Sequence, residues 1–290
     1  MSQTARFRET LRRLAMIDET FVEDAAGTCL GPAGALALDP RTAMLLQLGA
    51  LVATGASPEC VQWSTGRAMA AGVAADEIAD VLLAVGHNRR FWPSMRALRE
   101  ITTSGELGTI LHVEGHNSNE NSQGITAGWR LSPEESPGGG LTGAGLHVLD
   151  AFVSLVGPAR QVYARLSPRQ LGPPPLDSAM LAIDFANGVT GMLATIRATP
   201  FYWRVHVFGT NGSAEVLDEV TLVRRRSGTK PETIIYPAVD VLANELAAFA
   251  DAVERKQPFP IPQQEVLATL AAFDGALQSM QAGQSVPLDP

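Results

Sequence analysis

Apolar residues recur at three- and four-residue steps through the first part of the chain. The first apolar stripe consists of Leu11, Leu14, Ile17 and Phe21, a spacing typical of an amphipathic helix. Asp39-Pro40 and Ser57-Pro58 then each place a capping side chain before a proline at the first helical position, and Gly72 ends the second of these helices. No strand pattern occurs here, so residues 1–86 are predicted to form an all-α helical bundle piece.

The pattern changes after residue 86. A helix over 93–104 is followed by an alternating strand over 109–116, a polar Gly- and Pro-rich loop over 117–137 and a helix over 141–155. Further alternating runs are 161–167, 178–185, 189–198, 203–209 and 221–226, and two helices, 240–256 and 263–282, finish the chain. Consecutive strands with short turns predict a mostly antiparallel, open-faced sheet covered by helices on one side. The chain is therefore predicted to be multi-domain, with an α+β domain over 87–290.

Composition excludes some partners. Of the 290 residues 46% are hydrophobic and 18% are charged, and the net charge is −8, so no general positive field is available to attract nucleic acid. The run Arg224–Arg226 lies in a strand pattern, where a charged, solvated face is expected. The two cysteines, Cys29 and Cys60, are too few for a disulfide framework.

Neither a secretory leader nor a membrane span is expected from the sequence. The first 21 residues are amphipathic and have no apolar core of the kind that a signal peptide carries. The longest apolar run, 43–54, is shorter than a spanning helix requires and contains Gln47. These features predict a soluble, cytoplasmic protein without membrane partners.

The segment ASPECVQWSTGRAMAAGVAADEIADVLLAVG resembles the carboxymuconolactone decarboxylase and alkylhydroperoxidase-D-like superfamily. Ala68, Gly72 and Asp76-Glu77-Ile78 match the small-residue, glycine and acidic positions of its motif. The motif's histidine falls on Ser64 and the first cysteine of its redox pair on Ser57, so only Cys60 remains, with Glu59 beside it. The resemblance implies decarboxylase or peroxidase-like chemistry at Glu59 and Cys60. The favoured alternative is that this part folds, packs and drives homo-oligomerisation.

From about Gly86 onward the chain resembles the second, substrate and oligomerisation domain of the Gfo/Idh/MocA oxidoreductases. The matching segments are GHNRRFWPSMRALREITTSGELGTI, GWR, PGGGLTGAGLHVLDAFVSLVGP, FGTNGSAEV and NELAAFADAVERKQPFPI. Members of the family normally begin with a Rossmann domain that has a GxGxxG loop and a Glu-Lys-Pro motif, and neither is present here. No cofactor of the chain's own is therefore expected, and a fusion of two unrelated pieces is inferred.

The glycines over 138–145 superficially resemble a dinucleotide loop. That loop requires a preceding strand, a βαβ unit and an acidic residue about 20 positions on. Here a polar loop precedes the glycines and antiparallel strands follow the helix. The glycines are instead predicted to let the chain approach a pocket closely before the helix starts.

His147 matches the catalytic histidine of the oxidoreductase family, which implies a general acid or base toward a substrate hydroxyl. Imidazole suits this task because its pKa lies near neutrality. The companion aspartate, four residues earlier, is replaced by Gly143. Asp150 is interpreted as structural, and a packed histidine without a functional role is the alternative for His147.

His112, Glu114 and His116 alternate along one predicted strand and so share a face. Zinc ligation by the trio is disfavoured because the two histidines are separated by roughly 13 Å along a strand, and no metal is expected. Substrate contacts are instead expected from His116 and Asn117 near the strand end, and the resemblance adds Trp129 and Arg130 as a stacking and anion-binding pair. Arg89 and Arg90 are interpreted as surface or interdomain charges.

Three hypotheses follow for the function. The first is a small-molecule pocket in the C-terminal domain for a sugar-like, polyol or cyclic hydroxy-acid ligand, with His147 as the acid or base of an elimination or isomerisation. The second is a non-catalytic, homo-oligomeric assembly protein. The third is residual family activity: decarboxylase or peroxidase chemistry at Glu59 and Cys60, or an oxidoreductase whose nucleotide is supplied by another chain.

Overall fold

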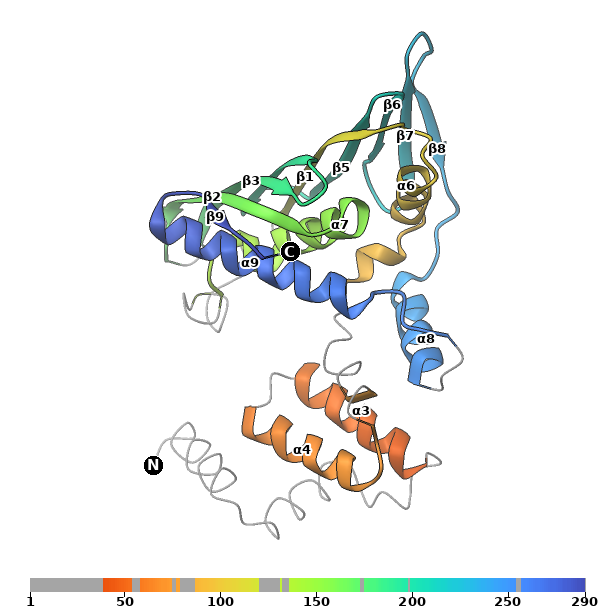
Figure 1. Ribbon diagram of the computed structural model, residues 1–290, viewed down its shortest axis with the longest axis vertical. Coiled ribbons are helices and arrows are strands. Elements are labelled where there is room, and N and C mark those ends of the chain that lie inside the picture. The colour runs from red at the N-terminus through yellow and green to blue at the C-terminus, as the bar shows by residue number, and fades with distance from the viewer. Residues whose placement is uncertain are drawn as a thin grey trace. The chain divides into compact units, whose positions relative to one another are not determined.

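The computed structural model describes residues 39–53, 58–74, 77–78, 87–119, 131, 136–172, 175–197, 199–253 and 257–289. The chain divides into two compact units, residues 1–85 with 251–258 and residues 86–250 with 259–290 (Figure 1).

The first unit contains two described helices, α3 (Pro40–Ala53) and α4 (Pro58–Ala70). Both begin at the predicted prolines, and Gly72 follows α4 with a positive φ of 84°, as expected for a glycine that ends a helix. The inward side chains of this pair include Leu45, Leu48 and Ala68, each at most 1% exposed. Residues 1–38 lie outside the described residues, so the predicted bundle is observed only as this helix pair.

The second unit is an α+β fold built on one large sheet (Figure 1). Its helical elements are the 3-10 turn η2 (Asn88–Phe91), α6 (Pro93–Thr103), the π-helical turn η5 (Leu141–Gly145), α7 (Leu146–Val156), α8 (Val241–Val253) and α9 (Gln263–Ala282). Its strands are β1 (Ile110–Asn119), β2 (Ala159–Gln170), β3 (Leu176–Phe185), β4 (Thr190–Arg197), β5 (Tyr202–Gly209), β6 (Gly212–Val216), β7 (Thr221–Arg226), β8 (Glu232–Ile235) and β9 (Val286–Pro287).

The strand order is β8-β7-β6-β5-β1-β4-β3-β2-β9. The pairing of β1 with β4 is parallel, and the other pairings of the described strands are antiparallel. The first strand of the sequence thus lies at the centre of the sheet, between two groups of strands that follow it. This confirms the predicted mostly antiparallel α+β architecture.

Turn chemistry sets the hairpins of this sheet. Asn187-Gly188 joins β3 to β4, Gly188 has a φ of 87°, and the Asn187 side chain donates to the Val156 carbonyl at 2.8 Å. Gly212 pairs with Gly209 across the next hairpin, and a Cβ on Gly212 would lie 2.3 Å from the Arg225 carbonyl oxygen. Both glycines therefore occupy positions that a larger residue would strain.

One face of the sheet is covered by α7 and α9 (Figure 1). Alternate strand residues point into this core, including Val113, Val162, Leu181 and Leu193, each at most 2% exposed. Gly115 brings β1 against α7, because a Cβ there would lie 2.2 Å from a Val148 methyl carbon. This close approach fixes the height of α7 over the middle of the sheet.

The chain enters α7 through the glycine-rich segment. Gly138 and Gly139 have positive φ values of 76° and 59°, and the Gly140 N–H donates to an Asp177 carboxylate oxygen at 2.9 Å. Asp177 also pairs with Arg197 at 3.0 Å. The glycines therefore permit close approach to the Asp177 carboxylate on β3, since a Cβ on Gly139 would lie 2.7 Å from it.

The other face of the sheet carries exposed apolar side chains on β2, β3 and β4. They include Tyr163, Met180, Met192 and Ile196, and the two methionines are 50% and 54% exposed. The predicted open face is thus present along these strands. Single exposed apolar side chains are common, but a group on adjacent strands is characteristic of a contact surface.

Several predicted boundaries needed correction. β1 continues to Asn119, so Asn117 is part of the strand and not of the predicted loop. The predicted helix over 141–155 starts with the π-helical turn η5, and the short strands β6, β8 and β9 were not predicted. Within the described residues, no helix combines the length and apolarity needed to cross a bilayer.

Candidate functional site

Several polar side chains of the second unit have a buried atom with no hydrogen-bond partner among the described residues, and five of these, linked by contacts or strand register, are here called the polar cluster. They are His87 before η2, Arg89 in η2, Asn117 on β1, His147 on α7 and Trp203 on β5. In each of them one nitrogen or oxygen is buried without a hydrogen-bond partner. Buried polar atoms are normally paired, so such a group is a candidate for binding a ligand.

His147 and His87 are in direct contact. Their ring centroids are 5.6 Å apart and the ring planes are at 82°, an edge-to-face arrangement. The Nδ1 atoms of both rings are buried and unpartnered. The two histidines come from segments 60 residues apart and converge because η2 lies beside α7.

Asn117 and Trp203 are register partners on neighbouring strands. Both side chains are buried, with Trp203 at 1% exposure, and Asn117 donates through Nδ2 to the Ala144 carbonyl at 2.8 Å. The Asn117 Oδ1 acceptor and the Trp203 Nε1 donor have no partner. The Ala144 contact places this acceptor beside the start of α7.

Arg89 is held by aromatic rings. Its guanidinium carbon lies 4.3 Å from the ring centroid of Trp203, 4.7 Å from that of Trp92 and 5.7 Å from that of Phe201. Nε is buried and unpartnered, and none of the ion pairs within the described part of the chain includes Arg89. Within the part of the chain that the structure describes, the charge is therefore stabilised by ring faces.

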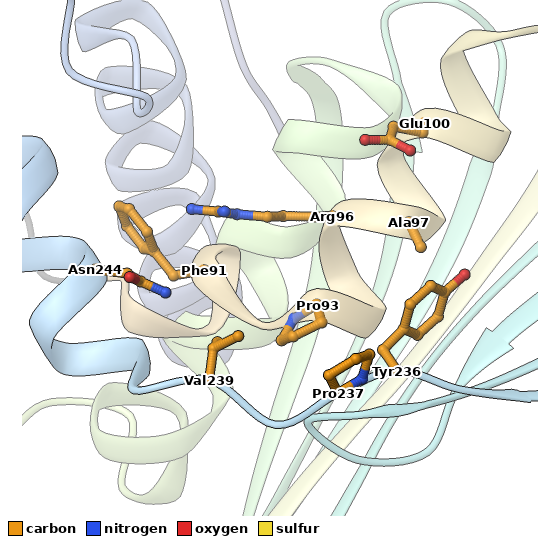
Figure 2. Close-up of a pocket in the computed structure, with 9 residues that line it drawn as sticks. All are labelled: Phe91, Pro93, Arg96, Ala97, Glu100, Tyr236, Pro237, Val239 and Asn244. Carbon is orange, nitrogen blue, oxygen red and sulfur yellow. The ribbon is translucent and has the colours of Figure 1, made fainter.

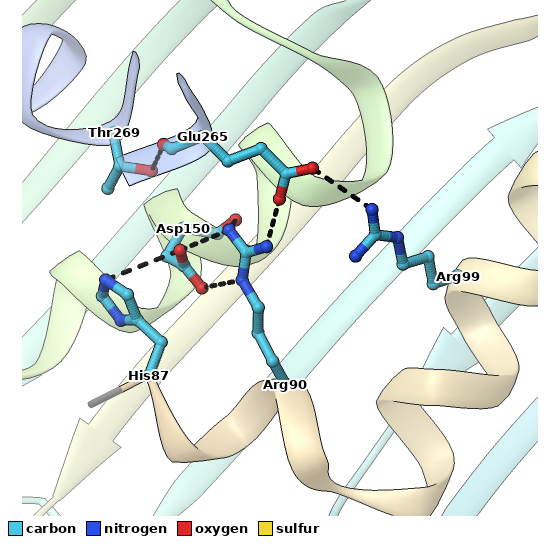
Figure 3. Close-up of polar contacts among 6 residues, drawn as sticks. All are labelled: His87, Arg90, Arg99, Asp150, Glu265 and Thr269. Atoms are coloured by element: carbon cyan, nitrogen blue, oxygen red, sulfur yellow. Dashed lines mark hydrogen bonds and ion pairs between the residues drawn. The ribbon is translucent and has the colours of Figure 1, made fainter. Parts of the chain in front are cut away.

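The neighbouring Arg90 belongs to a fully paired group, here called the ion network (Figure 3). Arg90 donates to both carboxylate oxygens of Asp150 at 2.7 and 2.6 Å and also to Glu265. Glu265 is further paired with Arg99 at 3.2 Å. His87 Nε2 lies 3.5 Å from the Asp150 carboxylate, so the ion network and the polar cluster are adjacent.

The pKa values of the polar cluster and of the ion network reflect the burial and the charge pairing of their side chains. Burial, together with the nearby Arg89 and His87, lowers the pKa of His147 to about 4. Burial and the Arg90 charge lower the pKa of His87 to about 4, and burial lowers that of Arg89 to about 10. Burial also raises the pKa of Asp150, which the contact with Arg90 opposes. Both histidines are neutral at pH 7.

His147 and Asn117 are thus brought to the same side of the sheet, as predicted, but His116 is not. His116 lies on the opposite face, where its Nε2 meets the Ser118 hydroxyl and its ring contacts Tyr202 at 5.1 Å. Adjacent strand residues necessarily point to opposite faces. The structure therefore separates the two expected substrate contacts of β1.

His112 and Glu114 share the face of His116. Glu114 pairs with Arg204 at 2.7 Å, and His112 Nδ1 meets the Thr190 hydroxyl at 2.7 Å. Arg204 also pairs with Glu215 at 2.8 Å. Over the described ranges, no three histidine, cysteine, aspartate or glutamate side chains are grouped closely enough to hold a metal ion.

The remaining predicted site residues lie outside the described residues. Trp129 and Arg130 fall in the segment 120–130, and the side chains of Glu59 and Cys60, in the first turn of α4, also fall outside. Their roles stay predictions.

The glycine segment before α7 does not fit a dinucleotide. Of its N–H groups, that of Gly140 is already used by the Asp177 carboxylate, and this carboxylate would repel a pyrophosphate at the same place. The Arg197 guanidinium, 3.0 Å from Asp177, is already paired and so is not available to bind a phosphate.

A separate open groove of about 330 Å³ lies between α6 and the segment that connects β8 to α8 (Figure 2). Its floor includes the buried Phe91, over which Arg96 lies with its guanidinium carbon 5.2 Å from the ring centroid. Tyr236 and Asn244 line the other wall. The groove contains no histidine, and so the polar cluster is the better candidate for acid–base chemistry.

His87, Arg89 and Trp203 were not predicted as site residues. The sequence interpretation of Arg89 and Arg90 as surface or interdomain charges was wrong, because both side chains are largely buried. The signal that could have identified them is the cluster of polar and aromatic residues in HNRRFW at the join of the two pieces, where the turn η2 lies beside α7. The structural role inferred for Asp150 is confirmed by its pairing with Arg90.

Two family profiles match the chain. Residues 95–215 match the GFO/IDH/MocA C-terminal domain, and residues 25–104 match the carboxymuconolactone decarboxylase family. These matches confirm the two resemblances identified in the sequence and their order along the chain.

Two curated relatives are named as oxidoreductases, like the family that matches residues 95–215. The chain is 25% identical over 225 residues to the uncharacterized oxidoreductase YrbE of Bacillus subtilis, covering 72% of this chain and 64% of that protein. It is 32% identical over 99 residues to the uncharacterized oxidoreductase C115.03 of Schizosaccharomyces pombe, covering 34% of this chain and 26% of that protein. The chain thus spans less than two thirds of the length of either relative.

Solved structures show the same fold. A protein described as an NADPH-dependent oxidoreductase from Desulfitobacterium hafniense superposes with a TM-score of 0.65 at 21% identity, covering 86% of this chain and 78% of that one. Levoglucosan dehydrogenase in complex with NADH and levoglucosan superposes with a TM-score of 0.61 at 20% identity, covering 74% and 70%. The comparisons therefore identify Gfo/Idh/MocA-like oxidoreductases as the relatives of the second unit.

Proposed function

We propose that the second unit binds a small hydroxylated molecule at the polar cluster, with His147 as the acid–base group that acts on it. The observation that carries this proposal is the grouping of five unpartnered buried polar atoms, from four segments of one unit, with His87 in contact with the His147 ring and Arg89 close enough to influence its charge. Unpaired buried groups cost free energy in the empty protein. A ligand that supplies their partners recovers that free energy on binding.

The available hydrogen bonds suit a ligand with hydroxyl groups. Asn117 offers an acceptor, Trp203 offers a donor, and a neutral imidazole offers one of each. A hydroxyl group is both donor and acceptor and can satisfy either type. The levoglucosan bound by a protein of similar fold is a sugar derivative, which supports a sugar-like, polyol or hydroxy-acid ligand here.

The chemistry proposed for His147 is proton transfer. Because its pKa is lowered to about 4, the ring is unprotonated at pH 7 and can accept a proton from a bound hydroxyl or from a carbon beside a carbonyl. The imidazolium then returns the proton, either to a departing hydroxyl that leaves as water in an elimination or to the neighbouring carbon in an isomerisation, and neither reaction needs a hydride acceptor. Asn117 would hold the ligand, while the Arg90–Asp150 pair keeps His87 and α7 in position.

The test is ligand screening of the full chain by thermal shift, using sugars, polyols and hydroxy acids, against the variant His147→Asn. Binding that weakens in the variant would support the proposal, and equal binding by both proteins would contradict it. NADH and NADPH are included in the screen. Micromolar binding of either would replace the proposal by an oxidoreductase activity with a nucleotide site that lies elsewhere.

We propose self-association as a second function, carried by the exposed apolar side chains of the open sheet face. Met180 and Met192 are half exposed on adjacent strands, with Tyr163 and Ile196 nearby. In this proposal residues 1–86 and 87–290 act as two domains, and the helical one also contributes to a homo-oligomer.

The mass of the full chain in solution tests the self-association. We expect a defined oligomer that dissociates in the double variant Met180→Lys/Met192→Lys, because two buried charges would oppose the contact. The matched control is Leu171→Lys, since Leu171 is an exposed apolar residue after the end of β2. A monomeric parent chain, or an oligomer unchanged by the double variant, would contradict the proposal.

A further inference from the structure

Arg89 is a cation without a counter-ion among the described residues, although the adjacent Arg90 has two. Arg90 is paired with Asp150 and Glu265 (Figure 3). Among the ion pairs and hydrogen bonds within the described segments, none is made by Arg89, whose Nε is buried. Leaving a buried charge without a counter-ion costs free energy. The burial of the Arg89 guanidinium therefore needs an explanation.

The aromatic contacts account for the position of Arg89 but not for its hydrogen-bond donors. Trp92 and Trp203 lie within 4.7 Å of the guanidinium carbon. Ring contacts of this kind attract the cation but use none of the five N–H donors of the fork. Stacked in this way, an arginine is held ready for a planar, bidentate acceptor such as a carboxylate.

The surrounding groups add both hydrogen-bond donors and acceptors. Trp203 Nε1 can only donate, whereas Asn117 Oδ1 can only accept. His147 and His87 are neutral at pH 7, so Arg89 is the one cation of the polar cluster. A single positive charge balances a monoanion, and the Asn117 acceptor calls for a ligand hydroxyl. Together these groups complement a molecule with one carboxylate and at least one hydroxyl.

We propose that the ligand of the polar cluster is a hydroxy acid whose carboxylate is bound by Arg89. This inference rests on the proposed function. The proposed function allows neutral sugars and polyols as well as hydroxy acids, whereas this inference restricts the ligand to negatively charged hydroxy acids. Arg89 positions the ligand by its carboxylate, and a ligand hydroxyl then lies against Asn117 and His147.

The experiment uses pairs of compounds that differ only in a carboxylate or a hydroxymethyl group. They are D-glucuronate and D-glucose, D-gluconate and D-glucitol, and D-glycerate and glycerol. Binding to the full chain is measured by calorimetry at low ionic strength. We expect at least one acid to bind about 10- to 100-fold more tightly than its neutral partner, the range expected for a charge-assisted hydrogen-bond pair.

Two substitutions assign the preference to Arg89. Arg89→Gln should reduce the affinity for the acid to that for the neutral partner, and Arg89→Lys, which keeps the charge but not the fork, should fall between them. Arg96→Gln is the matched control because Arg96 also stacks on an aromatic ring, that of Phe91, but is exposed. It should bind the acid as the parent chain does. Near-ultraviolet circular dichroism verifies that each variant is folded.

The failures of the two proposals are distinguishable. Equal binding of acid and neutral partner, sensitive to His147→Asn but not to Arg89→Gln, would overturn the hydroxy-acid inference and leave the proposed function standing. An acid preference that survives in Arg89→Gln would assign the carboxylate to another residue and overturn the role of Arg89. No binding of any of the six compounds would overturn both.

Discussion

The ion network and the polar cluster are adjacent, yet they treat buried polar groups in opposite ways. In the ion network, Arg90 is balanced by Asp150 and Glu265 through short, geometrically matched contacts. In the polar cluster, Arg89, His147 and their neighbours keep buried atoms without partners. The first arrangement stabilises the fold and the second costs stability, which is the expected signature of a site kept for a ligand.

The largest effect should come from breaking the ion network. Arg90→Met leaves the Asp150 carboxylate buried without its partner, and we expect a loss of about 3–5 kcal/mol in the free energy of unfolding. Urea denaturation measures it. Arg99→Met is the control, because Arg99 is 41% exposed and makes one contact to Glu265 at 3.2 Å, so its loss should stay below about 1 kcal/mol. Similar losses in Arg90→Met and Arg99→Met would contradict the expected difference between a buried and a partly exposed ion pair.

The pH dependence of stability reports on the polar cluster. His147 and His87 have folded-state pKa values lowered to about 4 from 6.5. The unfolded chain therefore binds more protons between these values, and stability falls as the pH drops through this window. Between pH 7 and pH 4.5 we expect each histidine to contribute a loss of about 2 kcal/mol.

Comparing urea midpoints of the parent chain and His147→Gln over this pH range isolates one of the two contributions. The variant should lose about 2 kcal/mol less than the parent chain as the pH falls to 4.5. An identical pH dependence in the two proteins would mean that His147 is not held neutral by burial.

The smallest effect should come from removing the unpaired cation. Arg89→Met deletes a buried charge that has no ion partner within the described residues, so the loss of ring contacts is offset by relief of desolvation. We expect the free energy of unfolding to change by less than about 1 kcal/mol in either direction. A loss as large as that of Arg90→Met would show that Arg89 is a structural residue, and the same urea series measures both.

Local patterns predicted much of the fold. Alternation identified β3 and β4, Asn187-Gly188 identified their hairpin, and α9 spans the predicted 263–282. The strands β6, β8 and β9 have five, four and two residues, too few for a period of two to stand out from a turn. Residues 1–38 lie outside the described residues, so the rest of the helical piece stays a prediction.

The candidate site could be predicted only in part, because sequence patterns pointed to single residues and not to the way that distant segments come together. His147 was identified by its motif, but His87, Arg89 and Trp203 reach it from distant segments, and no local pattern encodes that convergence. His116 illustrates the opposite error, because sequence proximity to Asn117 suggested a shared location. Adjacent residues of a strand point to opposite faces, so proximity in the sequence did not imply a shared site.

The central position of β1 has a consequence for how the chain folds. β1 pairs with β4, 78 residues later, and with β5, whose Arg204 lies 90 residues after Glu114. On a nascent chain this strand must wait for both neighbours, and closing such long loops before any pairing energy is gained slows folding. We expect the β2–β4 and β5–β8 meanders to form early from local hairpins, and the insertion of β1, which joins them into one sheet, to be the slow step.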